Sequence, residues 1–186
     1  MSRKNDKRDR LVDAADELIY QKTFHTTTLA DIAAKADVPL GNVYYYFKVK
    51  DEILLAVVQK REAELQSLFT VWDQLPNVRD RLRSFIEENS RGSDTIARFG
   101  CSLGSLCQEL GKQGGDVALY AANLMRKTLS WVEKQFKALG KEESALSLAE
   151  YLIASLQGIS LLTLTFKDPA FLHRQSKHLE QWLETA

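Results

Sequence analysis

A chain of 186 residues is long enough to bury a sizeable core in one or two compact units, and its 45% hydrophobic and 27% charged residues are typical of a soluble globular protein. Lysine and arginine together number 25, as do aspartate and glutamate, so the formal net charge is zero. This balance excludes a protein that attracts nucleic acid through its overall charge, and it leaves such attraction to local patches.

The N-terminal segment is charged where a signal peptide would be apolar, and no apolar run approaches the length of a membrane span. We therefore expect a cytoplasmic protein. In that compartment its two cysteines, Cys101 and Cys107, are expected to be reduced thiols and not a structural disulfide.

Residues 1–12 form a basic segment, with five lysines and arginines against two aspartates. Two interpretations stay open: an arm that reaches the minor groove or the phosphates of DNA, and a solvated, frayed terminus. The first helix is predicted over residues 8–20, where Leu11, Ala15, Leu18 and Ile19 form an apolar stripe.

A pair of short amphipathic helices follows. In each, apolar residues recur at i, i+3, i+4 and i+7: Leu29, Ile32, Ala33 and Ala36 in the first, and Leu40, Val43, Tyr44 and Phe47 in the second. Thr28 is placed to cap the first helix, with Asp31 as its capping-box partner, and Pro39 interrupts the pattern between the two. Two short helices joined by a tight turn make a helix-turn-helix.

The outer face of the second helix suits DNA, because the sequence has no acid between Val38 and Lys50. An asparagine can bond an adenine edge, phenols and lysines can bond phosphate oxygens, and a glycine lets the backbone approach a base closely. The side chains on this face are Gly41, Asn42, Tyr45, Tyr46 and Lys48. The alternative is a solvated surface helix whose tyrosines merely pack.

Residues 11–54 resemble the N-terminal domain of the TetR (tetracycline-repressor) family of bacterial transcriptional regulators. The matching residues are Ala14, Ala15, Phe24, Thr28, Ile32, Ala33, Ala36, Val38, Gly41, Tyr44, Phe47, Lys50 and Leu54. The resemblance implies that Thr28, Tyr44 and Lys50 hold phosphates. It also implies that Gly41, Asn42 and Tyr45 face the bases and that Tyr46 lies near the DNA backbone.

The sequence departs from the family pattern at four positions. Leu40 stands at a commonly polar position and is expected to finish the apolar stripe, the alternative being a contact with a thymine methyl. Thr23 and Asp37 stand where the family has glycine, so both are expected to adopt a left-handed conformation, which strains a β-branched threonine more than an aspartate. Val49 stands where the family has a serine or asparagine cap, and it offers no side-chain acceptor to the next helix.

That next helix is predicted to be long, because apolar periodicity continues from Lys50 without glycine or proline until Pro76. Helices are then predicted around residues 78–86, 99–110, 116–140, 144–166 and 169–183, with a turn at 90–94. The fold is thus expected to be all-α with about nine helices. The resemblance implies a helix-turn-helix DNA-binding domain at residues 1–50 and a helical ligand-binding and dimerisation domain at residues 51–186.

The last two helices, residues 144–166 and 169–183, carry more apolar surface than a small bundle needs. Gly158 and its small neighbours indicate that another helix approaches closely, since a glycine within a helix is otherwise destabilising. We therefore predict a homodimer through these two segments, which would read a palindromic operator. The alternative is a monomer that buries the same surface internally.

A small-molecule site is predicted between the helices of the second domain, lined by Phe85, Phe99, Cys101, Tyr120, Leu124 and Trp131. Few charges interrupt these stripes, which favours an apolar or aromatic inducer, although plain core is the alternative for most of these residues. His25, His173 and His178 are too scattered for a metal site. No catalytic constellation or cofactor motif is found, so neither an enzyme nor a cofactor is expected.

The sequence therefore predicts a ligand-responsive DNA-binding repressor, released from its operator by a small apolar or aromatic inducer. One alternative is a regulator that senses oxidants or electrophiles through Cys101, which follows Gly100 near a helix start where the dipole favours a thiolate. Burial as a structural residue is the competing interpretation of that cysteine. A third possibility is a helical enzyme or adaptor that keeps the helix-turn-helix only for packing.

Overall fold

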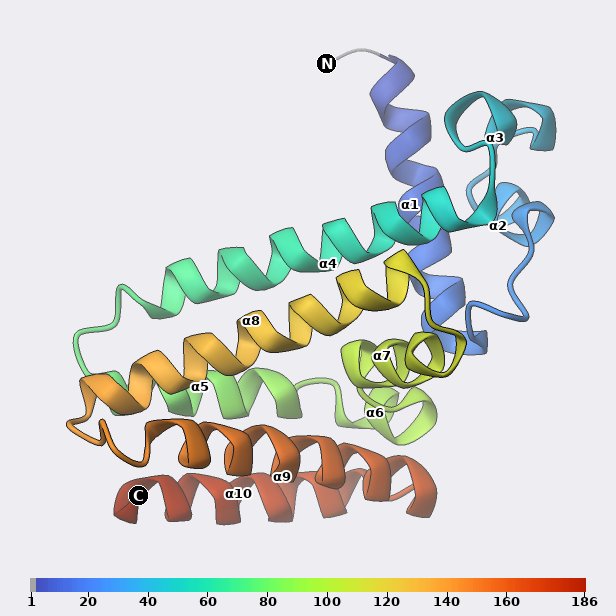
Figure 1. The fold of residues 1–186 in the computed structure, drawn as a ribbon. Helices are drawn as coiled ribbons and strands as arrows, with labels where there is room; N and C mark the ends of the chain where they lie inside the picture. The colour runs from blue at the N-terminus through green and yellow to red at the C-terminus, as the bar shows by residue number, and fades with distance from the viewer. Residues whose placement is uncertain (1–2) are drawn as a thin grey trace. The chain divides into compact units, whose positions relative to one another are not determined.

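The computed structural model describes residues 3–186, with side chains from Asp6 onward. All of its regular structure within that range is helical, as predicted (Figure 1). The helices are α1 (Arg3–Lys22), α2 (Leu29–Lys35), α3 (Leu40–Tyr46), α4 (Lys50–Trp72), α5 (Val78–Ser90), α6 (Ser93–Phe99), α7 (Ser102–Gln113), α8 (Asp116–Ala138), α9 (Ala145–Phe166) and α10 (Pro169–Thr185).

Two details differ from the sequence prediction. A separate short helix, α6, lies between Gly92 and Gly100, whose φ angles of 72° and 80° are left-handed and break the chain on both sides. The helix predicted over residues 99–110 therefore begins only at Ser102. The basic N-terminal segment is also helical from Arg3, whereas the side chains of Arg3 and Lys4 lie outside the described residues.

The chain divides into two compact units. The first comprises Met1–Glu64 and Ser105–Asn123, and the second comprises Leu65–Gly104 and Leu124–Ala186. α4, α7 and α8 each contribute residues to both units. This division by compactness differs from the functional boundary after residue 50, which remains a prediction.

The first unit forms around the inner faces of α1 to α4. Leu11 and Ala15 of α1, Ile32 of α2 and Val43 of α3 are all completely buried. α2 packs against both α1 and α3, as expected for a brace behind a helix-turn-helix. The larger of these side chains, Leu11, Ile32 and Val43, each contribute roughly 1.5–3 kcal/mol on burial, so short helices that are marginal alone are held by packing.

The second unit has α9 in its core and α10 beside it. α10 packs against α5, α6 and α9, and it begins at the predicted restart, where Asp168 caps the helix by accepting a hydrogen bond from Ala170 N–H at 2.9 Å (Figure 1). The largest aromatic rings gather within this unit. Phe69 and Trp131 stack with ring centroids 4.6 Å apart, and Trp72 and Phe85 close the cluster around them.

α9 is long and apolar enough to cross a membrane by length and composition alone, contrary to the expectation from the sequence. Its inner face nevertheless belongs to the core of the second unit, where Ala145, Ala149 and Leu152 are completely buried. Its apolar character elsewhere comes from an outer face that is solvent-exposed, and the larger exposed residues there are Leu146, Tyr151, Leu161, Leu162 and Phe166. An exposed apolar face of this kind marks an interaction surface.

Candidate nucleic-acid interface

The turn between α1 and α2 is rich in threonine and strained at one residue. Thr23 has φ 117°, as its place at a family glycine predicted, and such a conformation costs on the order of 1–3 kcal/mol in a β-branched residue. Hydrogen bonds hold the turn around it: Thr27 Oγ1 donates to Thr23 O at 2.7 Å, and Thr26 Oγ1 donates to Lys22 O at 3.2 Å.

α2 begins with the predicted capping box. Thr28 Oγ1 accepts a hydrogen bond from Asp31 N–H at 3.1 Å, and Thr28 N–H donates to Asp31 Oδ2 at 3.0 Å. The hydrogen bonds from the Thr28 backbone and hydroxyl lower the pKa of Asp31 below its usual range. Thr28 itself is exposed, so its position at the start of α2 is open to a phosphate.

The turn between α2 and α3 is fixed by an arginine from α1. Asp37 adopts the predicted left-handed conformation, with φ 51°. The Arg10 guanidinium donates to Ala36 O and, at 2.8 Å, to Asp37 O, so it caps the end of α2. Arg10 belongs to the basic segment for which both a DNA-reaching arm and a frayed terminus were considered, and its side chain binds the turn of the helix-turn-helix.

The outer face of α3 displays the residues predicted to meet DNA. Tyr45 is 61% exposed and Tyr44 49% exposed, whereas Tyr46 is half-buried and meets the Tyr45 ring edge-on at 5.1 Å. Asn42 is exposed, and a Cβ atom added at Gly41 would meet no other atom within 4 Å. The face therefore combines an amide, phenols and accessible backbone, which can bond base edges and phosphates.

The predicted apolar stripe of α3 is only half buried. Val43 and Phe47 enter the core, but Leu40 and Tyr44, which share their periodicity, are exposed. The prediction that Leu40 finishes the buried stripe was wrong, because the neighbouring helices cover only one part of this seven-residue helix. Tyr44 is accordingly accessible, as its implied phosphate contact requires.

The junction of α3 and α4 is bound by side chains on either side of Val49. Glu52 reaches back from the first turn of α4, and its Oε2 accepts a hydrogen bond from Lys48 N–H at 2.6 Å. The Lys48 ammonium donates to Tyr44 O at 2.7 Å and so places a positive charge at the end of α3, where it complements the helix dipole.

Lys50 is directed at the α1–α2 turn. Its ammonium donates to Phe24 O and, at 3.4 Å, to His25 O, and it lies 4.2 Å from the centroid of the Phe24 ring. Burial lowers the pKa of Lys50 from its ordinary value, while the charge of Glu109 opposes this change. The implied phosphate contact of Lys50 stays a prediction, and the structure gives this residue a second role in holding the turn.

Glu109 of α7 also binds this turn, and sequence reasoning missed it. Its carboxylate accepts hydrogen bonds from Phe24 N–H at 3.0 Å and from His25 N–H at 2.8 Å. Glu109 lies outside the segment that resembles the family, and no local motif marks it. Glu109 reaches the turn only because this part of α7 packs within the first unit.

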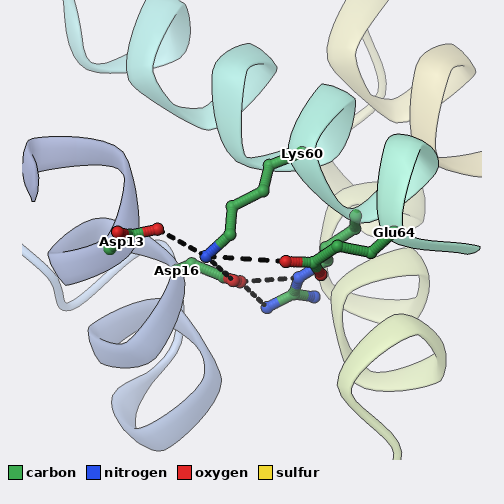
Figure 2. Close-up of polar contacts among 5 residues, drawn as sticks. Asp13, Asp16, Lys60 and Glu64 are labelled. Carbon is green, nitrogen blue, oxygen red and sulfur yellow. Dashed lines mark hydrogen bonds and ion pairs between the residues drawn. The ribbon is translucent and has the colours of Figure 1, made fainter. Parts of the chain in front are cut away.

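A network of charged side chains joins α1 to α4, as Figure 2 shows. Asp16 of α1 accepts a hydrogen bond from Arg61 at 2.7 Å and pairs with Lys60 at 3.2 Å, and Asp13 pairs with Lys60 at 2.6 Å. Burial would lower the pKa of Lys60, but the hydrogen bond to Asp13 and the charge of Asp16 together raise it. The network fixes the long helix against the brace of the helix-turn-helix.

The residues predicted to line a ligand site fall into several environments. Phe85 and Trp131 contact each other in the aromatic cluster of the second unit, where Leu124 is also buried. Phe99 and Cys101 are half-buried, and Tyr120 is exposed and belongs to the first unit. Within residues 3–186 no three histidine, cysteine or acidic side chains form a group that would hold a metal ion.

Comparison with known proteins identifies the N-terminal arrangement. Residues 11–57, which span α2, α3 and most of α1, match the family model of bacterial regulatory proteins of the tetR family. Residues 11–57 are a TetR-family DNA-binding domain. The family model and the names of the relatives together indicate a transcriptional regulator with a DNA-binding helix-turn-helix.

Two relatives show how far this TetR-family likeness extends. The HTH-type transcriptional repressor DhaR of Mycobacterium sp. is 28% identical over 166 residues, which are 83% of this chain and 80% of DhaR. The HTH-type transcriptional regulator SrpR of Pseudomonas putida is 41% identical over 63 residues, which are 34% of this chain and 30% of SrpR. Identity is therefore concentrated in a segment about as long as the DNA-binding part.

The TetR-family fold extends over the whole chain. The crystal structure of a TetR transcriptional regulator from Legionella pneumophila superimposes with a TM-score of 0.85 and covers 97% of each chain, at 18% sequence identity. The N-terminal helix-turn-helix and C-terminal helical part predicted from the sequence are confirmed by this likeness.

Proposed function

We propose that this TetR-family protein is a ligand-responsive repressor that acts as a homodimer on a palindromic operator. The observation that carries the proposal is the outer face of α3, which is exposed, free of acids and equipped with an amide and phenols, with Lys48 directly after the helix. Asn42, Tyr45 and Gly41 are assigned to the bases, while Thr28, Tyr44, Tyr46, Lys48 and Lys50 are assigned to the sugar-phosphate backbone. Such a protein acts in the cytoplasm.

The outer face of α9 supports the homodimer. Tyr151, Ala154, Gly158, Leu161 and Leu162 follow one another at helical spacing, and all of them are at least partly exposed. A Cβ atom at Gly158 would meet nothing within 4 Å, so no part of this chain makes the close approach that the glycine suggests. A second copy, packed through residues 144–166 and 169–183, would do so.

The proposed dimer sets the distance between the two recognition helices. Two recognition helices related by a two-fold axis read half-sites about 34 Å apart, one turn of the duplex. We propose an apolar or aromatic inducer held by residues of the second unit, from the set Phe85, Phe99, Cys101, Leu124 and Trp131. Its binding would favour a conformation whose recognition helices no longer match this spacing, and the operator would be released.

The decisive test is DNA binding by single-residue variants of α3. The operator would first be selected from random duplexes, and affinity would then be measured on operator and on unrelated DNA at several salt concentrations. Asn42→Ala should weaken operator binding about tenfold with little effect on unrelated DNA, because a bidentate base contact is worth roughly 1–3 kcal/mol of discrimination. Lys48→Ala should weaken both complexes equally and reduce the salt slope by about one.

Two outcomes would contradict the proposal. A wild-type protein that selects no sequence and shows no salt-sensitive complex would remove DNA binding and would favour an adaptor. Equal losses on both DNAs for Asn42→Ala would remove its role in sequence recognition. Gln108→Ala, an exposed change on α7, serves as the control and should leave both affinities unchanged.

A thiol-sensing regulator is the second candidate, and the surroundings of Cys101 favour it. The Cys101 sulfur accepts a hydrogen bond from Gly104 N–H at 3.3 Å and lies 3.6 Å from Gln157 Nε2. Two N–H donors thus lie within hydrogen-bonding distance of one half-buried sulfur. Loss of oxidant-triggered operator release in Cys101→Ser, with DNA binding intact, would establish this candidate, and an unchanged response would eliminate it.

A further inference from the structure

The turn between α1 and α2 is bound through both kinds of backbone group at the same two residues. Glu109 accepts from the N–H groups of Phe24 and His25, with one carboxylate oxygen for each donor, at 3.0 and 2.8 Å. Lys50 donates to the carbonyl oxygens of the same two residues. The Glu109 carboxylate thus binds the two N–H groups, and the Lys50 ammonium binds the two carbonyl oxygens. We call this arrangement the clamp.

Such a clamp is needed because the turn is strained. Thr23, directly before the clamped pair, has a φ angle of 117°, and strained backbone persists only where its surroundings fix it. Phe24 is buried, whereas Thr23, His25 and Thr26 are exposed, so apolar burial anchors this stretch at a single residue. The clamp supplies charge-assisted hydrogen bonds, which are stronger than neutral ones.

The clamped turn leads directly to Thr28 and the first turn of α2. Thr28 is the N-cap of α2 and has been assigned to a DNA phosphate in the proposed function. A phosphate contact at a helix start depends on where the first amides point, and a shift of the turn would misdirect them. The position of the turn therefore bears on DNA affinity.

We propose that Glu109 is a positioning residue for DNA binding: through the backbone of Phe24 and His25 it fixes the turn that presents Thr28 and the start of α2 to a phosphate. This inference rests on the proposed function and extends it to a residue far from the helix-turn-helix in sequence. Glu109 touches no DNA in this role. It contributes to the phosphate contacts, which are independent of sequence, and not to base recognition.

The proposal predicts a change in DNA affinity opposite in direction to the change expected from charge alone. Removal of an acid near a DNA-binding surface ordinarily strengthens binding, because repulsion from phosphates is reduced. Loss of Glu109 is expected to weaken binding instead. Glu109→Gln keeps one carbonyl acceptor for one of the two donors and is expected to lie between the wild type and Glu109→Ala.

The experiment uses the full-length wild type, Glu109→Gln, Glu109→Ala and the control Gln108→Ala. Hydrogen exchange of the Phe24 and His25 amides, followed by NMR, reports the clamp in the free protein. Affinity for the selected operator and for an unrelated duplex reports its consequence. For Glu109→Ala we expect amide protection and both affinities to fall about tenfold, because hydrogen bonds to a charged acceptor are lost. The ratio of the two affinities should stay unchanged.

The outcomes separate the possible failures. Wild-type affinity in Glu109→Ala, or affinity that increases, would overturn the positioning role while leaving the proposed function intact. A drop in the unfolding midpoint with unchanged protection at the two amides would also overturn it, since that is a general structural effect. A wild type that binds no duplex would overturn the proposed function together with this inference.

Discussion

The outer faces of α3 and α9 are both exposed, yet they differ in chemistry. α3 presents Asn42, Tyr44 and Tyr45, which carry hydrogen-bonding groups, on a helix of seven residues. α9 presents Tyr151, Leu161 and Leu162, which are mostly apolar, on a helix of 22 residues. In each helix the inner face belongs to the core of its own unit.

The difference indicates what each face contacts. Hydrogen-bonding side chains lose little when they exchange water for base edges and phosphates, so the α3 face suits DNA. Exposed leucines contribute favourable free energy only when they are buried. The α9 face therefore suits an apolar partner surface such as a second copy of α9. Three sets of substitutions test this contrast.

The largest expected effect comes from a charge placed on the α9 face. Leu161→Glu should convert the proposed dimer into a monomer at micromolar concentration, because a carboxylate in an apolar interface must be desolvated. Operator affinity should then fall by roughly 100-fold or more, since one half-site is lost and with it the effective concentration of the second. Light scattering and operator titration measure the two effects.

Val71→Glu is the matched control for that substitution. Val71 on α4 is 58% exposed, and Leu161 is 57% exposed. The control should leave the mass and the affinity unchanged. A wild type of monomer mass, or a Leu161→Glu variant that still dimerises, would show that the α9 face is not the dimer interface.

An intermediate effect, on the stability of the fold, is expected from the charged network that joins α1 to α4. The side chains of Asp16 and Arg61 are 19% and 9% exposed, so Asp16→Asn removes a negative charge that binds a largely buried arginine. We expect a loss of about 2 kcal/mol in the free energy of unfolding, which is below the value for fully buried pairs. Urea denaturation measures it, with Asp13→Asn, at a 64% exposed side chain, as a control near zero.

The effect of Asp16 depends on pH in a defined direction. The pKa of Lys60 is raised in the folded protein above its usual 10.5, so its ion pairs stabilise the fold fully below that pH. This contribution is lost as the pH rises through the raised pKa. The difference between wild type and Asp16→Asn should therefore be constant near neutral pH and shrink in strong alkali, and a difference that grew there would contradict the assignment.

The smallest effects come from adding one methyl group to each of three helical glycines. A Cβ atom at Gly41, Gly111 or Gly158 would meet no atom within 4 Å, so alanine at each should stabilise the isolated chain by roughly 0.5–1 kcal/mol. Gly41→Ala should also weaken DNA binding, and Gly158→Ala should weaken dimerisation, because each methyl intrudes on a partner. Gly111→Ala should change neither. Equal DNA affinity and equal dimerisation in all three variants would contradict the assignment of the α3 face to DNA and of the α9 face to a second copy.

Local patterns predicted several details of the backbone structure correctly. The capping box of Thr28 and Asp31, the left-handed residues at Thr23 and Asp37, and the cap at Asp168 all depend on neighbours within a few residues. The burial of Val43 and Phe47 was likewise predicted correctly from periodicity. The predicted burial of Leu40 was wrong, because coverage by other helices decides which part of an apolar stripe is buried.

The sequence by itself determined the all-helical class, the helix-turn-helix and the chemistry of its outer face, because capping, helical periodicity and side-chain type are properties of short segments. Only the tertiary structure decided what holds that face in place. Arg10 bonds the turn at Ala36 and Asp37, and Glu109 bonds the turn at Phe24. These contacts join residues 26 to 85 positions apart, and no local pattern records which distant side chain the packing of helices will bring to a backbone group.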